Sequence, residues 1–306
     1  MEILENHPQL LLSRRTISTK YVEASDLRPI AVLEDTLNYL WSLLESKEHS
    51  FEEVHDFMFD RTRSLRQDIT MQNIVNHKAI YLYERMVKFH VISHYNLWRS
   101  MSDPNTASMH HLNLEQLTKT LTSLFNLYEA NRNSNHVHEN EAEFHSLYVL
   151  LHLGSYSQPM GEPLSVWFRR VSTPVLKSKE MCFARRILRS SQLGNYKDFF
   201  CTAAAQATYL QFCIMMPYIN EVRALALSCI NFGGYKLHPY PLVDLSKHLM
   251  IKESDLESFC HYCGLEICTD ESGNKLLPTK QTTFSHPKGR FQSYSFLGLQ
   301  EYESQF

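Results

Sequence analysis

Glycine is scarce in this chain, with only nine among 306 residues. An average protein uses glycine at roughly 7% of its positions. Sandwiches, barrels and glycine-rich nucleotide-binding folds need many backbone corners with positive φ, which glycine supplies at little steric cost. The scarcity of glycine, together with the many Leu, Met, Phe and Tyr residues, predicts a mostly helical protein. A length of 306 residues allows one large domain or two smaller ones.

Apolar residues recur at helical spacing from about residue 28 to residue 232. The clearest apolar stripe consists of Ile30, Leu33, Leu37, Leu40, Trp41 and Leu44. Ser50 and Glu53 form a capping box that predicts the start of a second helix. Further helices are expected at about 77–99, after Asn113 as an N-cap, at 139–153, 178–190, 195–214, and at 217–231 with Pro217 in its first turn. Short links between helices of similar length favour antiparallel pairs stacked as a helical-repeat solenoid.

The pattern changes after Gly233-Gly234. Pro241 is expected to open a helix that runs to about Met250, and a capping box of Ser254 and Glu257 to open another that ends at Gly264. A short strand at 265–268, a turn at 270–274 and a returning strand at Leu276-Leu277 follow. This order is typical of a winged-helix domain. We therefore expect an N-terminal arm at 1–25, a helical-repeat domain at 26–234, a winged-helix domain at 235–285 and a C-terminal tail at 286–306.

The charges are unevenly distributed, although the formal net charge is only −3. Residues 2–60 carry twelve acidic and five basic side chains, whereas residues 163–189 carry seven basic side chains and one acidic. Residues 275–290 carry four basic side chains and no acidic one. This asymmetry permits binding of a polyanion near the C-terminal end. The alternative is that the charges only solvate helix faces.

Cysteine usage and the absence of familiar motifs bear on compartment and chemistry. Seven cysteines, an odd number lying mostly in apolar stretches, favour reduced thiols inside a cell. No signal peptide or apolar run long enough to span a bilayer is evident, so we expect a soluble protein without a membrane partner. Cys260-His261-Tyr262-Cys263 with Cys268 invites a zinc interpretation, but a fourth ligand at suitable spacing is missing.

Histidine spacing does not indicate an enzyme either. His90 and His94 are four residues apart, but Val91 stands where a metalloprotease helix needs Glu. The sequence has no nucleophile elbow, phosphate-binding loop or dinucleotide fingerprint. We therefore expect a protein that is not an enzyme and needs no cofactor or metal.

The densest polar motif runs from Asp60 to Gln72. Its candidate residues are Arg61, Arg63, Arg66 and Asp68. Three arginines at this spacing could grip phosphates bidentately. Acidic residues flank them, however, so an internal ion-pair network that locks two helices is the favoured interpretation.

Basic residues near the proposed wing alternate with aromatic ones. Lysine and arginine beside exposed aromatic rings suit single-stranded nucleic acid, because cations meet phosphates and rings stack on bases. The alternative is that Phe284, Phe291 and Tyr294 pack the tail onto its domain. The candidate nucleic-acid-binding residues are Lys275, Lys280, Lys288 and Arg290, with Arg169, Arg170, Arg185 and Arg186 as an extension.

Several of these motifs together resemble a known family. They are Leu27-Arg28-Pro29, the segment Arg61–Gln72, Phe89-His90, Glu141-x-Glu143-Phe144 and Gly194-Asn195-Tyr196-x-x-Phe199-Phe200. The chain resembles, over about residues 26–280, the GANP family of mRNA-export scaffolds (suppressor of actin and germinal-centre-associated nuclear protein). The family's Cys-Pro-rich motif, nucleoporin-like repeats and acetyltransferase-like region are not seen in this sequence, so we expect either a short paralogue or a fragment.

The resemblance implies a fold and a role. The fold would be a PCI-like helical-repeat domain capped by a winged helix. That winged helix would pair with a second PCI-domain protein, supported by a small acidic subunit, in a hetero-oligomer that binds RNA or DNA. The complex would act in the nucleus, at or near the nuclear pore. The alternative is a pure protein-interaction subunit of another PCI assembly, such as the proteasome lid, the signalosome or a translation initiation complex.

Overall fold

The chain is mostly helical, as its composition predicts. The computed structural model describes residues 27–46, 49–100, 104–132, 138–154, 163–286 and 294–297. Within these residues it has twelve α-helices and three short strands. The predicted arm at 1–25 lies outside the described residues, as do Lys288, Arg290 and Phe291.

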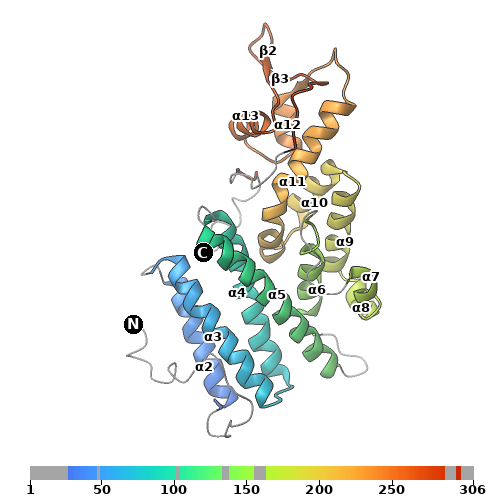
Figure 1. Cartoon of the computed structure of the whole chain (residues 1–306). Coiled ribbons are helices and arrows are strands. Elements are labelled where there is room, and N and C mark those ends of the chain that lie inside the picture. The colour runs from blue at the N-terminus through green and yellow to red at the C-terminus, as the bar shows by residue number, and fades with distance from the viewer. Residues whose placement is uncertain are drawn as a thin grey trace. The chain divides into compact units, whose positions relative to one another are not determined.

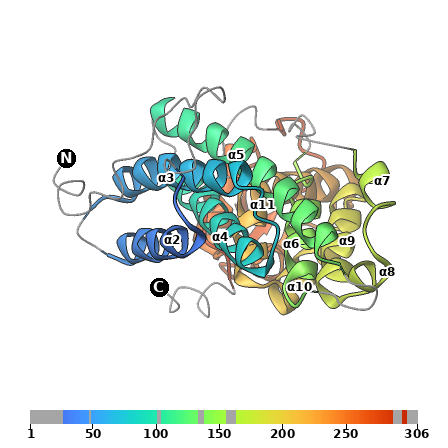
Figure 2. The same cartoon turned by 90° about the horizontal axis from the view of Figure 1, so that it is seen from below.

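The chain divides into two compact units, Met1–Phe144 and His145–Phe306. The first unit is a helical bundle, seen from two sides in Figures 1 and 2. Its helices α2, α3, α4 and α5 pack together, and α4 and α5 share the most extensive contact. They span Ile30–Glu45, Phe51–Met71, His77–Ser100 and Pro104–Ala130. Helix α6, Glu141–Leu150, begins in this unit and ends in the second.

Two local signals in the first unit have different outcomes. Ser50 caps α3 with a complete capping box to Glu53, which confirms that prediction. Asn113 does not cap a helix, because α5 already begins at Pro104 and Asn113 is buried within it. The Asn113 side chain instead accepts from His90 Nδ1 and donates to the His90 carbonyl, each at 2.8 Å. The Asn113 amide thus binds His90 of α4 instead of forming the N-cap that local spacing predicts.

The helices of the second unit begin with α7 and α8, which are one turn each. They are followed by α9, α10 and α11, and the five helices span Leu164–Trp167, Thr173–Leu176, Lys179–Gln192, Tyr196–Gln206 and Tyr209–Gly233. The expected helix start at Pro217 is wrong, since Pro217 lies inside α11. The start is at Thr208, whose hydroxyl accepts from the backbone N–H of Gln211 in a capping box. This pairing satisfies the free N–H groups of a helix start better than proline, which only omits one.

Helix α11 is also long and apolar enough to span a membrane by length and composition. About two thirds of its apolar window, 67%, is buried inside the protein. It carries a fully buried arginine, Arg223. We therefore interpret α11 as the core helix of the second unit.

A small sheet and two helices complete the second unit. In chain order they are β1 Tyr240–Pro241, α12 Leu242–His248, α13 Glu253–Tyr262, β2 Cys268–Thr269 and β3 Lys275–Leu277. Strand β3 lies between β1 and β2 and is antiparallel to both. No strand was predicted at the position of β1.

The ends of α13 also separate a correct prediction from a wrong one. Gly264 follows the helix with φ of +74°, as expected of a C-terminal glycine. The Ser254–Glu257 capping box is wrong, because α13 starts at Glu253 after Lys252. The backbone N–H of Lys252 donates to Ser295 Oγ at 3.0 Å, so a residue distant in sequence binds at this helix start.

Candidate nucleic-acid interface

Asp68 of the arginine-rich motif on α3 forms an ion pair with Arg28, which lies in the segment before α2. Arg28 Nε donates to Asp68 Oδ2 at 2.6 Å, and its Nη2 donates to Ser64 Oγ at 2.7 Å. The two charged side chains are only 10% and 7% exposed. Gln72 Nε2 then donates to the Arg28 carbonyl at 2.8 Å. This is the geometry of an internal lock, and it joins the two motifs at Leu27-Arg28-Pro29 and Arg61–Gln72.

The arginines of the motif differ in their surroundings. Arg66 donates to Gln116 of α5 at 2.8 Å, and burial lowers the pKa of its guanidinium to about 10. The Arg61 guanidinium lies 5.4 Å from the centre of the Phe57 ring. Arg63 is exposed. Of the three arginines, Arg63 has the most open guanidinium for a phosphate.

The described lysines of the proposed wing already have internal partners. Lys275 of β3 forms an ion pair with Glu257 of α13. Lys280 has a φ of +65°, and its ammonium donates to the Phe232 carbonyl at the end of α11. Both residues remain exposed. Phosphate binding by either lysine would therefore compete with these contacts.

Two of the three aromatic residues near the wing pack onto the unit. Phe284 meets Phe232 edge to face, with ring centres 5.7 Å apart. Tyr294 is 8% exposed and meets Phe259 edge to face at 5.2 Å. Both rings therefore pack onto other parts of the unit, as the alternative to base stacking predicts.

The other predicted cations lie around α7 and α9. Arg169 and Arg170 follow α7 and are exposed, and Arg185 of α9 stacks over Phe168 at 5.9 Å. Arg186 pairs with Asp198 of α10, and its Nε donates to both carboxylate oxygens at 3.1 Å. Hydrogen bonds from Arg186 and Ser190 hold the Asp198 pKa at about 2. Within the second unit, α7 and α8 lie at the opposite end from β2 and β3, so the predicted residues form two groups (Figure 1).

The buried Arg223 was missed by the sequence analysis. Its guanidinium donates to the carbonyls of Leu249, Met250 and Ser295 at 3.2, 2.8 and 2.9 Å, and to Asn220 Oδ1 at 2.9 Å. Burial lowers its pKa to about 9. Arg223 therefore joins α11 to the end of α12 and to residues 294–297. The signal in the sequence is a single arginine within the apolar run of α11.

Exposed apolar side chains at the end of α11 and just after it were also missed. Phe232, Tyr235 and Leu237 are 56%, 80% and 88% exposed. We call these three residues the apolar strip. The sequence signal is three large apolar residues next to Gly233-Gly234, where no core is expected.

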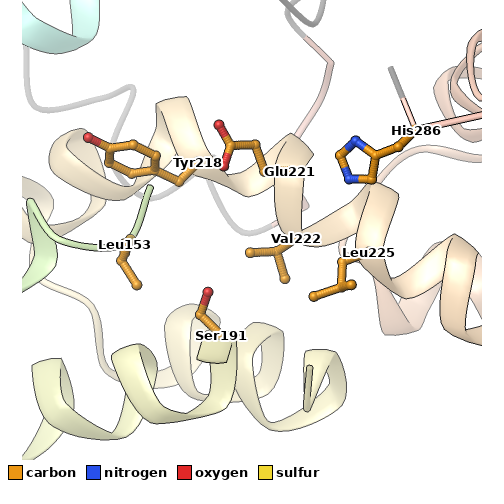
Figure 3. A pocket seen from close by; sticks show the side chains of 7 residues that line it. All are labelled: Leu153, Ser191, Tyr218, Glu221, Val222, Leu225 and His286. Atoms are coloured by element: carbon orange, nitrogen blue, oxygen red, sulfur yellow. The ribbon is translucent and has the colours of Figure 1, made fainter. Parts of the chain in front are cut away.

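A shallow pocket in the second unit lies between α9, α11 and His286 (Figure 3). Its lining residues are Leu153, Ser191, Tyr218, Glu221, Val222, Leu225 and His286. Burial raises the pKa of Tyr218 to about 12, so its phenol stays protonated. The lining offers one carboxylate and one imidazole without a nucleophile activated by a neighbouring base.

Metal-ligating side chains are not gathered in the part of the chain that the structure describes. No group of three or more His, Cys, Asp or Glu residues there could hold a metal ion. Cys260 and Cys263 are buried, and burial raises the pKa of each thiol to about 12. Both side chains are therefore protonated thiols in the metal-free protein, and a metal would have to displace their protons to bind.

Comparison with known proteins adds family evidence to this geometry. The model of the SAC3/GANP family matches residues 11–269. SAC3 family protein B of Arabidopsis thaliana is 32% identical over 250 residues, which are 80% of this chain and 15% of that protein. SAC3 family protein 1 of Schizosaccharomyces pombe is 28% identical over 85% of this chain and 26% of its own length. Protein xmas of Drosophila melanogaster is 27% identical over 86% of this chain and 13% of its own length. The chain thus spans about a quarter or less of each of these relatives.

Proposed function

Because the chain belongs to the SAC3/GANP family, we propose that it is a non-enzymatic scaffold subunit of a nuclear PCI-type complex that links transcription to mRNA export. The homologues suggest a role in mRNA export complexes. The scaffold would hold a PCI-domain partner with its small acidic subunit, and RNA or DNA. It would do so in the nucleus, at or near the pore.

The topology of the second unit supports the winged-helix part of this proposal. Strand, helix, helix and a two-stranded return, with β3 between β1 and β2, is the order that a winged helix requires. Asp270 builds the tip of the return, because its Oδ1 accepts from the backbone N–H groups of Ser272 and Asn274 at 2.9 and 2.8 Å. The packing of α10 against both α9 and α11 supports a helical-repeat stack ahead of the winged helix.

The exposed apolar strip is the main observation in favour of a docked protein partner. Its side chains lie next to the proposed winged helix and expose apolar surface that a folded chain normally covers. Large aromatic and aliphatic side chains are the usual anchors of protein interfaces. The occupant that fits the family is the winged helix of the PCI-domain partner.

Affinity purification from nuclear extract tests the partner proposal. We expect a PCI-domain protein, identified by mass spectrometry, to co-elute with the wild-type chain and to be lost from the double variant Tyr235→Ser, Leu237→Ser. Leu193→Ser is the matched control, because Leu193 is 69% exposed in the same unit but lies after α9. Equal recovery of the PCI-domain protein with all three chains would overturn the assignment of the strip.

Nucleic-acid binding at the same end is the second part of the proposal. We assign phosphate contacts to Lys275 and Lys280, and to Lys288 and Arg290 outside the described residues. Each contact to single-stranded nucleic acid that is removed should reduce the salt dependence, log K against log [salt], by about 0.7. An unchanged slope after replacement of all four residues would exclude them.

A pure protein-interaction subunit is the competing function. The internal partners of Lys275 and Lys280 favour it, because these ammonium groups already have acceptors. A gel shift of the chain, alone and with its partner, separates the two functions. Absence of binding to both RNA and DNA in both states would establish the interaction-only function.

A further inference from the structure

Positive charge is concentrated in the segment from α7 to α10. Its first two helices, α7 and α8, lie at the end of the second unit away from the strands (Figure 1). Residues 163–206 are all described and carry eight basic side chains against two acidic ones, Glu180 and Asp198. The whole chain is formally negative at −3. This basic excess is therefore a local property of this segment.

Two exposed arginines of this segment lie on the same side of α9. Arg185 and Arg189 are one turn apart and exposed, while the neighbouring Ala184, Ile187 and Leu188 are buried. The stacking of Arg185 on Phe168 brings the end of α7, with the exposed Arg169, beside α9. Lys177, exposed at the end of α8, stands two residues before α9 begins. We call Arg169, Lys177, Arg185 and Arg189 the basic face.

The charges of the basic face are available to a ligand. Within the described residues, none of its four side chains forms an ion pair. Arg186, next to Arg185 in sequence, is held by Asp198 instead. Within the part of the chain that the structure describes, the basic face thus consists of cations without an ion-pair partner, whereas the nearby Arg186 has one.

We propose that the basic face is a contact surface for single-stranded RNA, separate from the C-terminal end assigned above. Three of the four cations are arginines, whose planar guanidinium groups bind phosphate oxygens bidentately. The Arg185 guanidinium, already stacked on Phe168, presents a flat surface on which a base can stack. The choice of RNA among polyanions rests on the proposed role in mRNA export; the position of the surface rests on the charges alone.

Fluorescence anisotropy with a labelled oligouridine, titrated at several salt concentrations, tests the face in the full-length chain. The test variant replaces Arg169, Lys177, Arg185 and Arg189 with Gln. We expect roughly tenfold or greater weakening at moderate salt, and a fall of about 3 in the salt slope, from about 0.7 for each lost phosphate contact on a single strand. The matched control is Arg186→Gln, which removes one cation that Asp198 already neutralises and should leave the slope within about 0.3 of wild type.

The remaining outcomes separate this inference from the proposed function. Lost RNA binding with normal recovery of the PCI-domain partner supports the basic face, provided that the thermal unfolding midpoint of the variant is unchanged. An unchanged slope in the fourfold variant overturns it, as does a wild-type chain that binds oligoglutamate but not oligouridine, because the partner would then be an acidic protein segment. Either overturning result leaves the purification of the PCI-domain protein intact. Failure of that purification, in turn, leaves the RNA titration intact.

Discussion

At the scale of single residues, the fully buried Arg223 makes four hydrogen bonds with its guanidinium. Three of its four acceptors are backbone carbonyls, two of them at the end of α12 and one at Ser295. A buried carbonyl without a donor costs roughly 1–3 kcal/mol. The stability of the second unit therefore depends on a buried guanidinium whose four acceptors among the described residues are all uncharged.

Replacing Arg223 with Met should lower the free energy of unfolding by about 3 kcal/mol or more. Methionine fills much of the same space but leaves the carbonyls without donors. Urea unfolding followed by circular dichroism measures the loss. Arg169→Met, at an exposed position, is the control and should stay within about 0.5 kcal/mol of wild type. If Arg223→Met lost no more unfolding free energy than Arg169→Met, water would have to reach the three carbonyls in place of the guanidinium.

His90 predicts a pH dependence of stability. It is fully buried, and burial, followed by the charge of Arg66, lowers its pKa from 6.5 to about 3. The folded state therefore keeps His90 neutral while the unfolded state takes up a proton below pH 6.5. Stability should fall as the pH falls from 6.5 toward 3, by about 1.4 kcal/mol per pH unit from this group. His55, whose pKa burial also lowers, adds a slope of the same sign.

Urea unfolding between pH 5 and 7 tests the contribution of His90. His90→Asn keeps an N–H donor for Asn113 and should remove about one proton's worth of the slope, even if it lowers stability at pH 7. His77→Asn, at an exposed position at the start of α4, should keep the wild-type slope. The same slope in all three proteins would assign the pH dependence to other groups.

At the scale of elements, the lock between Arg28 and Asp68 holds the segment before α2 on α3. A double-mutant cycle with Arg28→Ala and Asp68→Ala should give a coupling energy of about 2 kcal/mol, because both side chains are nearly buried. The exposed pair of Lys78 and Glu34, at 3.3 Å between α4 and α2, is the comparison and should couple by about 0.5 kcal/mol or less. Equal coupling in the two cycles would show that Arg28 gains nothing from its burial with Asp68.

The helices could be predicted from the sequence because their signals are local. Apolar spacing and the Ser50 capping box act within a few residues, so no knowledge of the rest of the fold is needed. Asn113 and Pro217 misled for the opposite reason. The partner of Asn113 is His90, 23 residues away, and Pro217 was outweighed by a better start at Thr208. Boundaries depend on such competition between signals, whereas the existence of a helix does not.

The charged residues of the candidate site could likewise be predicted only in part from the sequence. The sequence displays every cation but not its counter-ion, so Arg185 and Arg186 look equivalent as neighbours on α9. Tertiary packing places Asp198 beside Arg186 and Phe168 beside Arg185. In the same way it gives Lys275 the carboxylate of Glu257. Which cations remain for a ligand is decided by contacts between elements.

At the scale of the whole molecule, each of these networks lies inside one compact unit. Arg28, Ser64, Asp68 and Gln72 belong to the first unit, and every described hydrogen-bond partner of the Arg223 guanidinium belongs to the second. A network confined to one unit stabilises that unit directly, and distant independent sites usually add. The two units should therefore respond separately to substitutions.

Hydrogen exchange of the full-length chain, read by mass spectrometry, tests this separation. Asp68→Ala should speed exchange in α2 and α3 and leave α9 to α13 at wild-type rates, because only the first unit loses contacts. Arg223→Met should do the reverse, speeding exchange in α11 and α12 while α2 to α4 stay protected. Local opening reports the stability of the cooperative unit that contains each amide. Faster exchange throughout the chain in either variant would mean that the units unfold together, and a partner docked on the apolar strip would then stabilise both.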